Sequence, residues 1–221
     1  MKGKFITFEG SEGCGKSTQS KMLAEYLKAQ GKQVVYLREP GATKVSEKIR
    51  NILLDKHNDA MLPNCELLLY MAARAQIVGE IIIPALKQGK VVICDRFLDS
   101  TLAYQGYGLG LDLDLIKQIG KFATSCIKPD LTIFLDLAIH KGLYHRRESK
   151  DRIESRTLAY HRRVRKGYFE LAKQEPKRIR IVKVNKYLEV TQEKIREIVL
   201  NNINLKLKEK NAKPRFKINN F

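Results

Sequence analysis

Eight consecutive residues near the start of the sequence have the spacing of a loop that binds phosphate. The stretch from Gly10 to Ser17 reads GSEGCGKS and fits the pattern G-x-x-x-x-G-K-[ST]. Glycines there let successive backbone N–H groups turn inward around a phosphate, and a following helix adds the positive end of its dipole. Lys16 suits the β- and γ-phosphates, and the Ser17 hydroxyl suits Mg²⁺. We therefore predict a nucleoside triphosphate site built from Gly10, Ser11, Glu12, Gly13, Cys14, Gly15, Lys16, Ser17 and Thr18.

Charged residues follow two further strand-like segments. Arg38 comes directly after the segment 33–37, and Asp95 and Arg96 come after 91–94. In open α/β sheets, ligands bind at the carboxyl ends of the strands. Asp95 is therefore placed to orient Mg²⁺ together with Ser17, and Arg96 to hold a phosphate. A surface ion pair is an equally good interpretation of Arg38 taken alone.

The elements that must position these residues alternate along the chain. Apolar, β-branched runs over 4–9, 33–37, 91–94, 131–137 and 179–184 predict five strands, and helix-like segments separate them. One long helix is expected over 63–87, with an interruption or kink near Pro84. Continuous apolar strands that alternate with helices indicate an α/β fold, a doubly wound five-stranded parallel sheet with helices on both faces. We expect one domain over residues 1–205.

Composition narrows the function classes without deciding among them. The 221 residues carry a formal net charge of +18, which fits either nucleic-acid binding or an enzyme with polyanionic substrates. Much of the excess lies in 146–166 and in a basic tail, 206–221, which we expect to be solvated. The four cysteines are too scattered for a zinc site and are expected to be reduced thiols. No apolar run approaches the length of a membrane span and no signal peptide is expected, so we predict a cytoplasmic protein without membrane contact.

Taken together, the motifs resemble the thymidylate kinases over about residues 4 to 200. The resemblance rests on segments in the family's order and at about its spacings. They are Phe8-Glu9-Gly10-x-Glu12-Gly13-x-Gly15-Lys16-Ser17-Thr18, Arg38-Glu39-Pro40-Gly41, Tyr70-x-Ala72-Ala73-Arg74-Ala75-Gln76, Asp95-Arg96-Phe97-x-x-Ser100-Thr101, Ala103-Tyr104-Gln105-Gly106, Lys128-Pro129-Asp130-Leu131-Thr132 and Asp151-Arg152-Ile153-Glu154. The family's activity would be ATP-dependent phosphorylation of dTMP to dTDP, with Mg²⁺, usually in a homodimer packed through helices such as that over 66–83.

The resemblance also implies a set of residues that bind dTMP. An aromatic ring at Tyr70 would stack on thymine, and a guanidinium at Arg74 would bond a base carbonyl. Tyr104 would crowd the 2′ position of the sugar, and Glu12 would contact the 3′-hydroxyl. Arg38 and Arg96 would hold the acceptor phosphate. The full expected set is Glu12, Arg38, Tyr70, Arg74, Arg96, Ser100, Thr101, Tyr104 and Gln105.

A basic segment between the fourth strand and the next helix resembles the family's lid over ATP. We place the lid at about 140–155. In these enzymes a catalytic arginine lies either in the phosphate-binding loop or in the lid. The loop has none at its variable positions, which favours the lid type common in bacteria. The catalytic residues predicted are Lys16, Arg96, Arg146, Arg147 and Arg152.

A few positions depart from the family pattern, and rival functions stay open. Ala42 stands where a second glycine is common, Cys14 where alanine or serine is common, and Gly79 where an acid is usual. The nearest rival is a kinase of the same fold with another acceptor. A rival of a different class is a P-loop ATPase that binds nucleic acid, although the chain's length and the Tyr104-Gln105 segment argue against it. A catalytically silent homologue is disfavoured because Lys16 and Arg96 are present.

Overall fold

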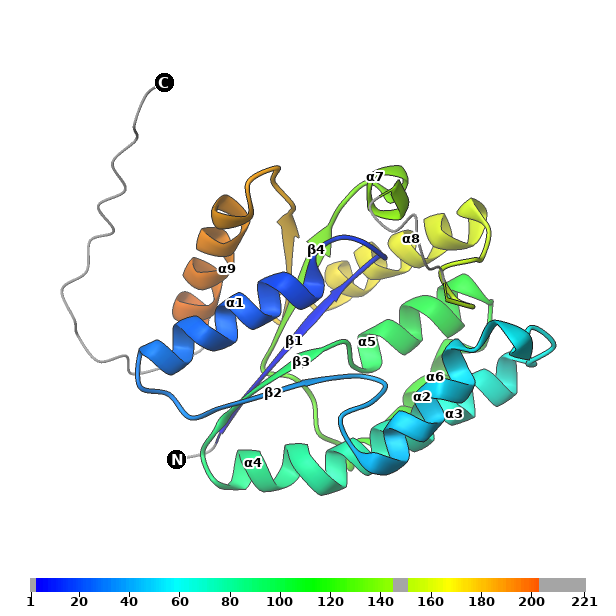
Figure 1. Cartoon of the computed structure of the whole chain (residues 1–221), viewed down its shortest axis with the longest axis horizontal. Coiled ribbons are helices and arrows are strands. Elements are labelled where there is room, and N and C mark those ends of the chain that lie inside the picture. The colour runs from blue at the N-terminus through cyan, green and yellow to red at the C-terminus, as the bar shows by residue number, and fades with distance from the viewer. Residues whose placement is uncertain (1–2, 145–150, 203–221) are drawn as a thin grey trace.

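The computed structural model describes residues 3–144 and 151–202. Within them a central parallel sheet has the strand order β2-β3-β1-β4-β5 (Figure 1). Every neighbouring pair of strands is parallel, as predicted. The strands are β1 (Lys4–Gly10), β2 (Val34–Arg38), β3 (Val91–Asp95), β4 (Leu131–Asp136) and β5 (Ile179–Lys183). β1, which leads into the phosphate-binding loop, is therefore the central strand.

Helices cover both faces of this sheet. α1 (Lys16–Ala29) and α9 (Leu188–Asn202) pack together on one face, over Ile6 and Phe8 of β1. The other face is covered by α2 (Lys44–Leu54), α3 (Pro63–Ile77), α4 (Ile83–Lys87), α5 (Leu98–Thr101), α6 (Leu113–Ala123) and α8 (Leu158–Gln174). Short elements complete the fold: a 3₁₀ turn η1 (Lys56–Asn58), π-helical turns η2 (Val78–Ile82) and η3 (Leu102–Gly108), and α7 (Ile139–Tyr144). The doubly wound α/β architecture is confirmed.

Local sequence signals explain where several helices begin. The Thr43 side chain accepts a hydrogen bond from the backbone N–H of Ser46 at the start of α2, and Asp112 caps α6 in the same way. Thr157 caps α8, and Pro63 opens α3 at a position where its missing N–H costs nothing. Such caps fix the entry of each helix and so the face that it presents to the sheet.

The helical stretch 63–87 is interrupted near Pro84, as predicted. The interruption is the π turn η2, which lies just before Pro84. The stretch is also long and apolar enough by composition to cross a membrane, with a mean hydropathy of 1.4, which corrects the expectation that no run reaches that length. It is weak evidence for a span, because Leu67, Met71 and Ile77 are buried in the fold and core helices meet the same criteria. The predicted tail 206–221 lies outside the described residues.

Candidate active site

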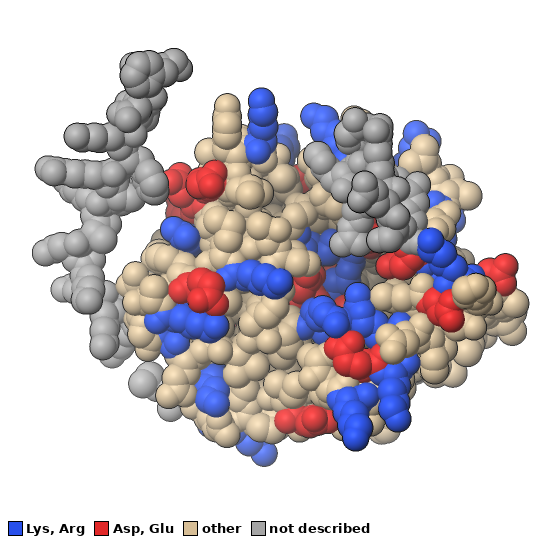
Figure 2. Space-filling view, in the orientation of Figure 1, with Lys and Arg blue, Asp and Glu red and all other residues tan. Residues whose placement is uncertain are grey.

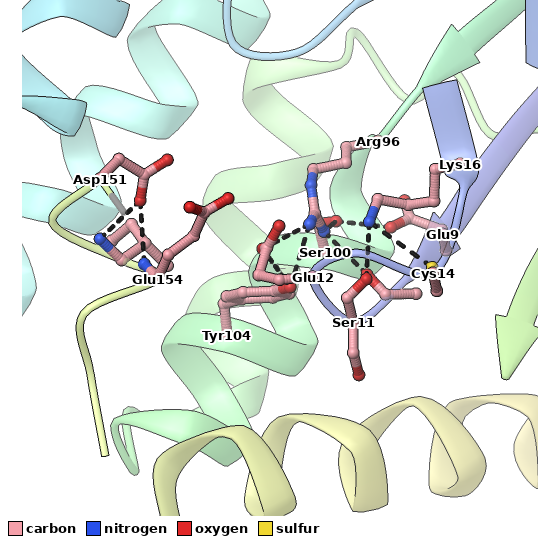
Figure 3. A network of polar contacts seen from close by, with 12 residues as sticks. Glu9, Ser11, Glu12, Cys14, Lys16, Arg96, Ser100, Tyr104, Asp151 and Glu154 are labelled. Atoms are coloured by element: carbon pink, nitrogen blue, oxygen red, sulfur yellow. Dashed lines mark hydrogen bonds and ion pairs between the residues drawn. The ribbon is translucent and has the colours of Figure 1, made fainter. Parts of the chain in front are cut away.

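The phosphate-binding loop between β1 and α1 has the backbone conformation that its glycines allow. Gly10, Gly13 and Gly15 all have positive φ angles, of 144°, 68° and 86°. A Cβ atom on Gly13 would approach within 2.0 Å of the backbone oxygen of Gly142 in α7, so no other residue fits there. Lys16 opens α1, and its Nζ donates to the carbonyl oxygen of Ser11 at 2.8 Å (Figure 3). The loop is thus a preformed cradle for an anion.

A cavity of about 360 Å³ joins this loop to the carboxyl ends of β2 and β3. All nine residues predicted to bind the acceptor nucleotide line it, as do both predicted Mg²⁺ ligands, Ser17 and Asp95. Of the loop, Glu12, Gly13, Gly15, Lys16, Ser17 and Thr18 line it, whereas Gly10, Ser11 and Cys14 do not. Segments distant in the sequence therefore converge on one site, at the sheet edge where the strand pattern placed it.

Arg96 lies at the centre of the polar network in this cavity. It has a positive φ of 74°, and its Nη2 donates to Glu12 Oε1 at 2.6 Å and to the Tyr104 hydroxyl at 3.0 Å (Figure 3). Its Nη1 donates to the carbonyl oxygen of Gly10 and to Ser100 Oγ. Burial alone would lower the pKa of Arg96, but the Glu12 carboxylate raises that pKa well above its ordinary value. The guanidinium is therefore a fixed cation aimed at the phosphate side of the site.

The hydroxyl of Tyr104 belongs to the same network. It donates to Glu12 Oε1 at 2.7 Å, and the Arg96 guanidinium lies 4.8 Å from the centre of the Tyr104 ring. Burial raises the pKa of Tyr104 well above its ordinary value, which keeps the phenol protonated as a donor. The ring comes from η3 and Glu12 from the phosphate-binding loop, so this contact joins the two halves of the cavity.

Glu9, to which the sequence pattern assigned no role, is connected to this network through Ser100, which contacts both Glu9 and Arg96. The carboxylate is fully buried on β1 and accepts from the Phe97 backbone N–H at 2.7 Å, from Ser100 Oγ, and from the Tyr168 hydroxyl at 2.9 Å. Burial first, and then the nearby Asp99, raise the pKa of Glu9 to about 7. Glu9 belongs to the Phe8-Glu9-Gly10 motif, but its partners come from the start of α5, from α5 itself and from α8, so they could be found only from the fold.

The base-binding residues predicted on α3 have different surroundings. Arg74 is buried, and its Nε donates to Glu39 Oε2 at 2.8 Å while its Nη1 donates to Thr101 Oγ1 at 3.0 Å. Burial raises the pKa of Glu39 to about 7, although Arg74 acts to lower it. Tyr70 lies one turn earlier and lines the same cavity. Glu39 is thus a second unassigned residue of the site, and it orients Arg74.

Arg38 and Gln105 also line the cavity, and each is held by a neighbouring carboxylate. Arg38 Nη2 lies 3.1 Å from both Glu47 carboxylate oxygens. The surface ion pair that the sequence left open for Arg38 therefore exists, and Arg38 still lines the cavity. Gln105 is buried, and its Nε2 donates to Glu66 Oε1 at 2.8 Å.

The predicted lid arginines are only partly described. Arg146 and Arg147 lie outside the described residues. Arg152 does not line the cavity: its Nη2 lies 2.6 Å from Glu66 Oε2, and its Nε donates to the carbonyl oxygen of Leu53 at 2.9 Å. Its neighbours Asp151, Ile153 and Glu154 do line the cavity, a contribution that sequence reasoning missed. The role of Arg152 as a catalytic arginine stays a prediction.

The predicted Mg²⁺ ligands are adjacent. Ser17 Oγ donates to Asp95 Oδ2 at 2.5 Å, where α1 begins and β3 ends. The side chains of Ser17 and Asp95 would both offer oxygen atoms to a metal, and oxygen ligands suit Mg²⁺. Within residues 3–144 and 151–202, no group of three or more His, Cys, Asp or Glu side chains is arranged to hold a metal. Mg²⁺ needs only one or two protein ligands when phosphates supply others, so the pair fits this ion.

Comparison with known proteins agrees with the geometry. The family model described as thymidylate kinase matches residues 8–195. A thymidylate kinase of Geobacter sulfurreducens is 47% identical over 209 residues, which cover 91% of this chain and 98% of that protein. One from Thermoanaerobacter sp. is 50% identical over 179 residues, which cover 80% and 88%. The crystal structure of thymidylate kinase from Ehrlichia chaffeensis superposes with a TM-score of 0.76 at 35% identity, covering 90% of this chain and 100% of that one. With its loop, its cavity and these relatives in agreement, this chain belongs to the thymidylate kinase family.

Proposed function

We propose that this chain transfers the γ-phosphoryl group of ATP to the 5′-phosphate of dTMP, giving dTDP and ADP. The observation that carries the proposal is the single cavity of about 360 Å³ that Lys16, Arg96, Tyr70 and Arg74 line together. A donor cradle and a nucleotide acceptor site within one cavity are what an in-line transfer between two nucleotides requires. Membership of the thymidylate kinase family supports dTMP as the acceptor.

Catalysis in this proposal depends on positioning and on charge. A phosphate oxygen of dTMP is already a nucleophile, so the reaction needs no strong general base. Lys16 holds the β- and γ-phosphates, and Arg96 and Arg38 hold the acceptor phosphate in line. Ser17 and Asp95 would hold Mg²⁺, which would supply positive charge to offset that of the donor phosphates. The bonds from Glu12 and Tyr104 keep Arg96 in one orientation before substrate arrives.

Recognition of the nucleoside is assigned to the α3 and η3 side of the cavity. The Tyr70 ring stacks on thymine, and Arg74, oriented by Glu39 and Thr101, donates to a base carbonyl. Ser100, Thr101 and Gln105 complete the base and sugar pocket. Tyr104 occupies the space that a 2′-hydroxyl would need, and Glu12 accepts from the 3′-hydroxyl. Charge on the transferring group would be stabilised by arginines of the lid, for which Arg146, Arg147 and Arg152 are the candidates.

A homodimer is proposed through α3 and its surroundings. Leu68 on α3 is 55% exposed and Phe122 on the neighbouring α6 is 87% exposed. Exposed apolar side chains on two neighbouring helices suit a surface that another protein chain covers. Cytoplasmic residence is proposed with it, since Cys14, Cys65, Cys94 and Cys126 are all free thiols.

The rival P-loop ATPase that binds nucleic acid has less support. On the face drawn in Figure 2, and apart from the grey residues, Lys and Arg side chains are interspersed with Asp and Glu rather than gathered into one stripe. Such an ATPase should show hydrolysis stimulated by DNA and DNA binding that weakens steeply with salt.

A coupled assay of ADP formation tests the proposal. With dTMP, dUMP, dCMP, AMP and thymidine as acceptors, dTMP should give the highest kcat/KM. In Lys16→Ala we expect phosphoryl transfer to be nearly abolished while the fold, followed by circular dichroism, is kept, because Lys16 contacts the donor phosphates. Another preferred acceptor would refute dTMP, and near-normal turnover of a folded Lys16→Ala variant would refute the active-site assignment.

A further inference from the structure

A fully buried carboxylate, that of Glu66, lies at the base of the acceptor side of the cavity. Glu66 is in the first turn of α3 and has no exposed surface. It precedes Tyr70 and Arg74 by one and two turns, so the three share a helix face. A carboxylate removed from water is costly unless hydrogen-bond donors surround it. The donors of Glu66 come from two other segments, and both of those segments also line the cavity.

One carboxylate oxygen fixes a residue of the pocket. Glu66 Oε1 accepts from Gln105 Nε2 at 2.8 Å, and Gln105, itself 2% exposed, lines the cavity. An ionised carboxylate can only accept hydrogen bonds, so the NH₂ end of the Gln105 amide must face Glu66. The amide oxygen of Gln105 therefore faces away from the Glu66 carboxylate, and its orientation is fixed.

The other oxygen holds the segment 151–156. Glu66 Oε2 lies 2.6 Å from Nη2 of Arg152 and 2.6 Å from Nη2 of Arg156. Between these two arginines the chain contributes Ile153 and Glu154 to the cavity wall. The position of that wall relative to α3 is therefore set by one charge-assisted hydrogen bond, from Arg156, and by an ion pair with Arg152.

Arg156 connects Glu66, through Tyr160, to a second residue that lines the cavity, Tyr104. Its Nη1 donates to the Tyr160 hydroxyl at 2.8 Å, and its guanidinium lies 4.7 Å from the centre of the Tyr160 ring. The Tyr160 hydroxyl in turn donates to the carbonyl oxygen of Tyr104 at 3.3 Å. Glu66 is thus connected to both Gln105 and Tyr104, by routes that use different atoms.

We propose that Glu66 is a positioning residue for the acceptor nucleotide, one that fixes the Gln105 amide and the 151–156 wall in a single geometry. This inference rests on the proposed function, because it takes dTMP as the ligand of this side. Loss of the negative charge leaves Arg152 and Arg156 side by side without a counter-ion, and their mutual repulsion should displace the wall. The ATP side, built from the phosphate-binding loop, makes none of these contacts and should be little affected.

The test compares Glu66→Gln with a matched control, Glu175→Gln. Glu175 also accepts from two cations, Arg178 and Lys128, but it does not line the cavity. For each variant we would measure the thermal midpoint, kcat, both KM values, and the Kd of dTMP by calorimetry. In Glu66→Gln the KM and Kd for dTMP should rise by about ten- to a hundredfold, the range expected for lost hydrogen bonds to a charged group. The KM for ATP should stay within about threefold, and Glu175→Gln should lower only the thermal midpoint.

A second variant guards against failure of Glu66→Gln to fold. Arg156→Gln removes a side chain that is 19% exposed, leaves Glu66 paired with Arg152, and should raise the KM for dTMP by about three- to tenfold. Where both single variants fold, the double variant should be less impaired than the product of the two effects, since the two residues act through one contact. Values for dTMP within about threefold of wild type in the folded variants, or a rise that Glu175→Gln matches, would overturn the inference. A wild-type enzyme that neither binds nor phosphorylates dTMP would instead refute the proposed function.

Discussion

At the scale of single residues, the contacts of the side chains separate two arginines that are both predicted to be catalytic, Arg96 and Arg152. Arg152 has 7% of its side chain exposed and is engaged by Glu66 and by the Leu53 carbonyl, whereas Arg96 faces the cavity with Glu12 as its counter-ion. The place of Arg96 after a strand, and the resemblance of the segment around Arg152 to the family's lid, predicted that both residues belong to the site region. It could not predict which carboxylate each would meet, because those partners lie on elements far away in the chain.

Replacement of each lid arginine by alanine should therefore give two distinct outcomes. Arg152→Ala breaks a buried ion pair, which typically costs about 3–5 kcal/mol, so we expect a clearly lower thermal midpoint. Arg146→Ala and Arg147→Ala should keep the midpoint, and an arginine that contacts the transferring group should lower kcat more than either KM. Steady-state kinetics at saturating ATP and dTMP, together with thermal unfolding, distinguish the two.

Partial redundancy among the arginines makes the triple variant the decisive control. Arginine fingers contribute about 10³–10⁵-fold, so even a shared role should leave a visible loss of kcat. If the triple variant keeps most of its kcat, the charge must come from Arg96 or from the Arg162-Arg163 pair. A wild-type midpoint with a large loss of kcat in Arg152→Ala alone would make Arg152 the catalytic arginine and contradict its structural role.

At the scale of elements, the site depends on a π-helical turn that no sequence pattern indicated. The strands and main helices could be predicted because apolar runs, caps and glycines are local signals. A π turn such as η3 depends on what packs against it, here α8. The turn η3 brings the consecutive residues Tyr104 and Gln105 to the same cavity. The motif alone predicted that both belong to the site, but not the turn that places them there.

The close approach of η3 and α8 can be tested at Gly108. A Cβ atom there would lie 2.6 Å from the Tyr160 ring and 2.9 Å from Val164 Cγ2, both buried. We expect Gly108→Ala to lower the free energy of unfolding by about 1–3 kcal/mol through overpacking and to raise the KM for dTMP, because η3 carries Tyr104. Chemical denaturation and steady-state kinetics provide the two readouts.

Gly79, in the other π turn, is the matched control for Gly108. Its added Cβ atom would meet nothing within 4 Å, and the residue is exposed. Gly79→Ala should therefore be neutral, or stabilise the protein by about 0.5–1 kcal/mol through the lower backbone entropy of the unfolded chain. Equal effects of the two substitutions would show that the contact between η3 and α8 is more adaptable than its geometry implies.

At the scale of the whole molecule, the order of strands decides which buried groups meet. The sequence indicated five parallel strands, but not that β1 would lie between β3 and β4. That order surrounds Glu9 with Phe97 and Ser100, at the start of α5, and with Tyr168 of α8. A buried acid at the centre of the sheet is therefore a product of topology, and its protonation should influence the stability of the entire fold.

The pKa of Glu9 predicts how the stability of the native fold depends on pH. Because the native state raises this pKa from 4.5 to about 7, it holds the proton more tightly than the unfolded chain does. This contribution to stability is fully present below pH 4.5 and is lost as the pH rises through 7. Gln suits the site as a neutral substitute: its oxygen can accept from the Phe97 N–H, and its NH₂ can donate to the Ser100 and Tyr168 hydroxyls.

We therefore expect the free energy of unfolding of Glu9→Gln, relative to wild type, to rise between pH 4.5 and about 7 and then to level off. The total rise should be up to about 3 kcal/mol, the equivalent of the shift in pKa. Urea denaturation at a series of pH values measures it, and taking the difference between the two proteins cancels other titrating groups such as Glu39. Parallel pH profiles for wild type and variant would mean that Glu9 is ionised in the native state throughout this range. In that case the stability of the sheet would depend on a fixed buried charge, compensated by the donors around it.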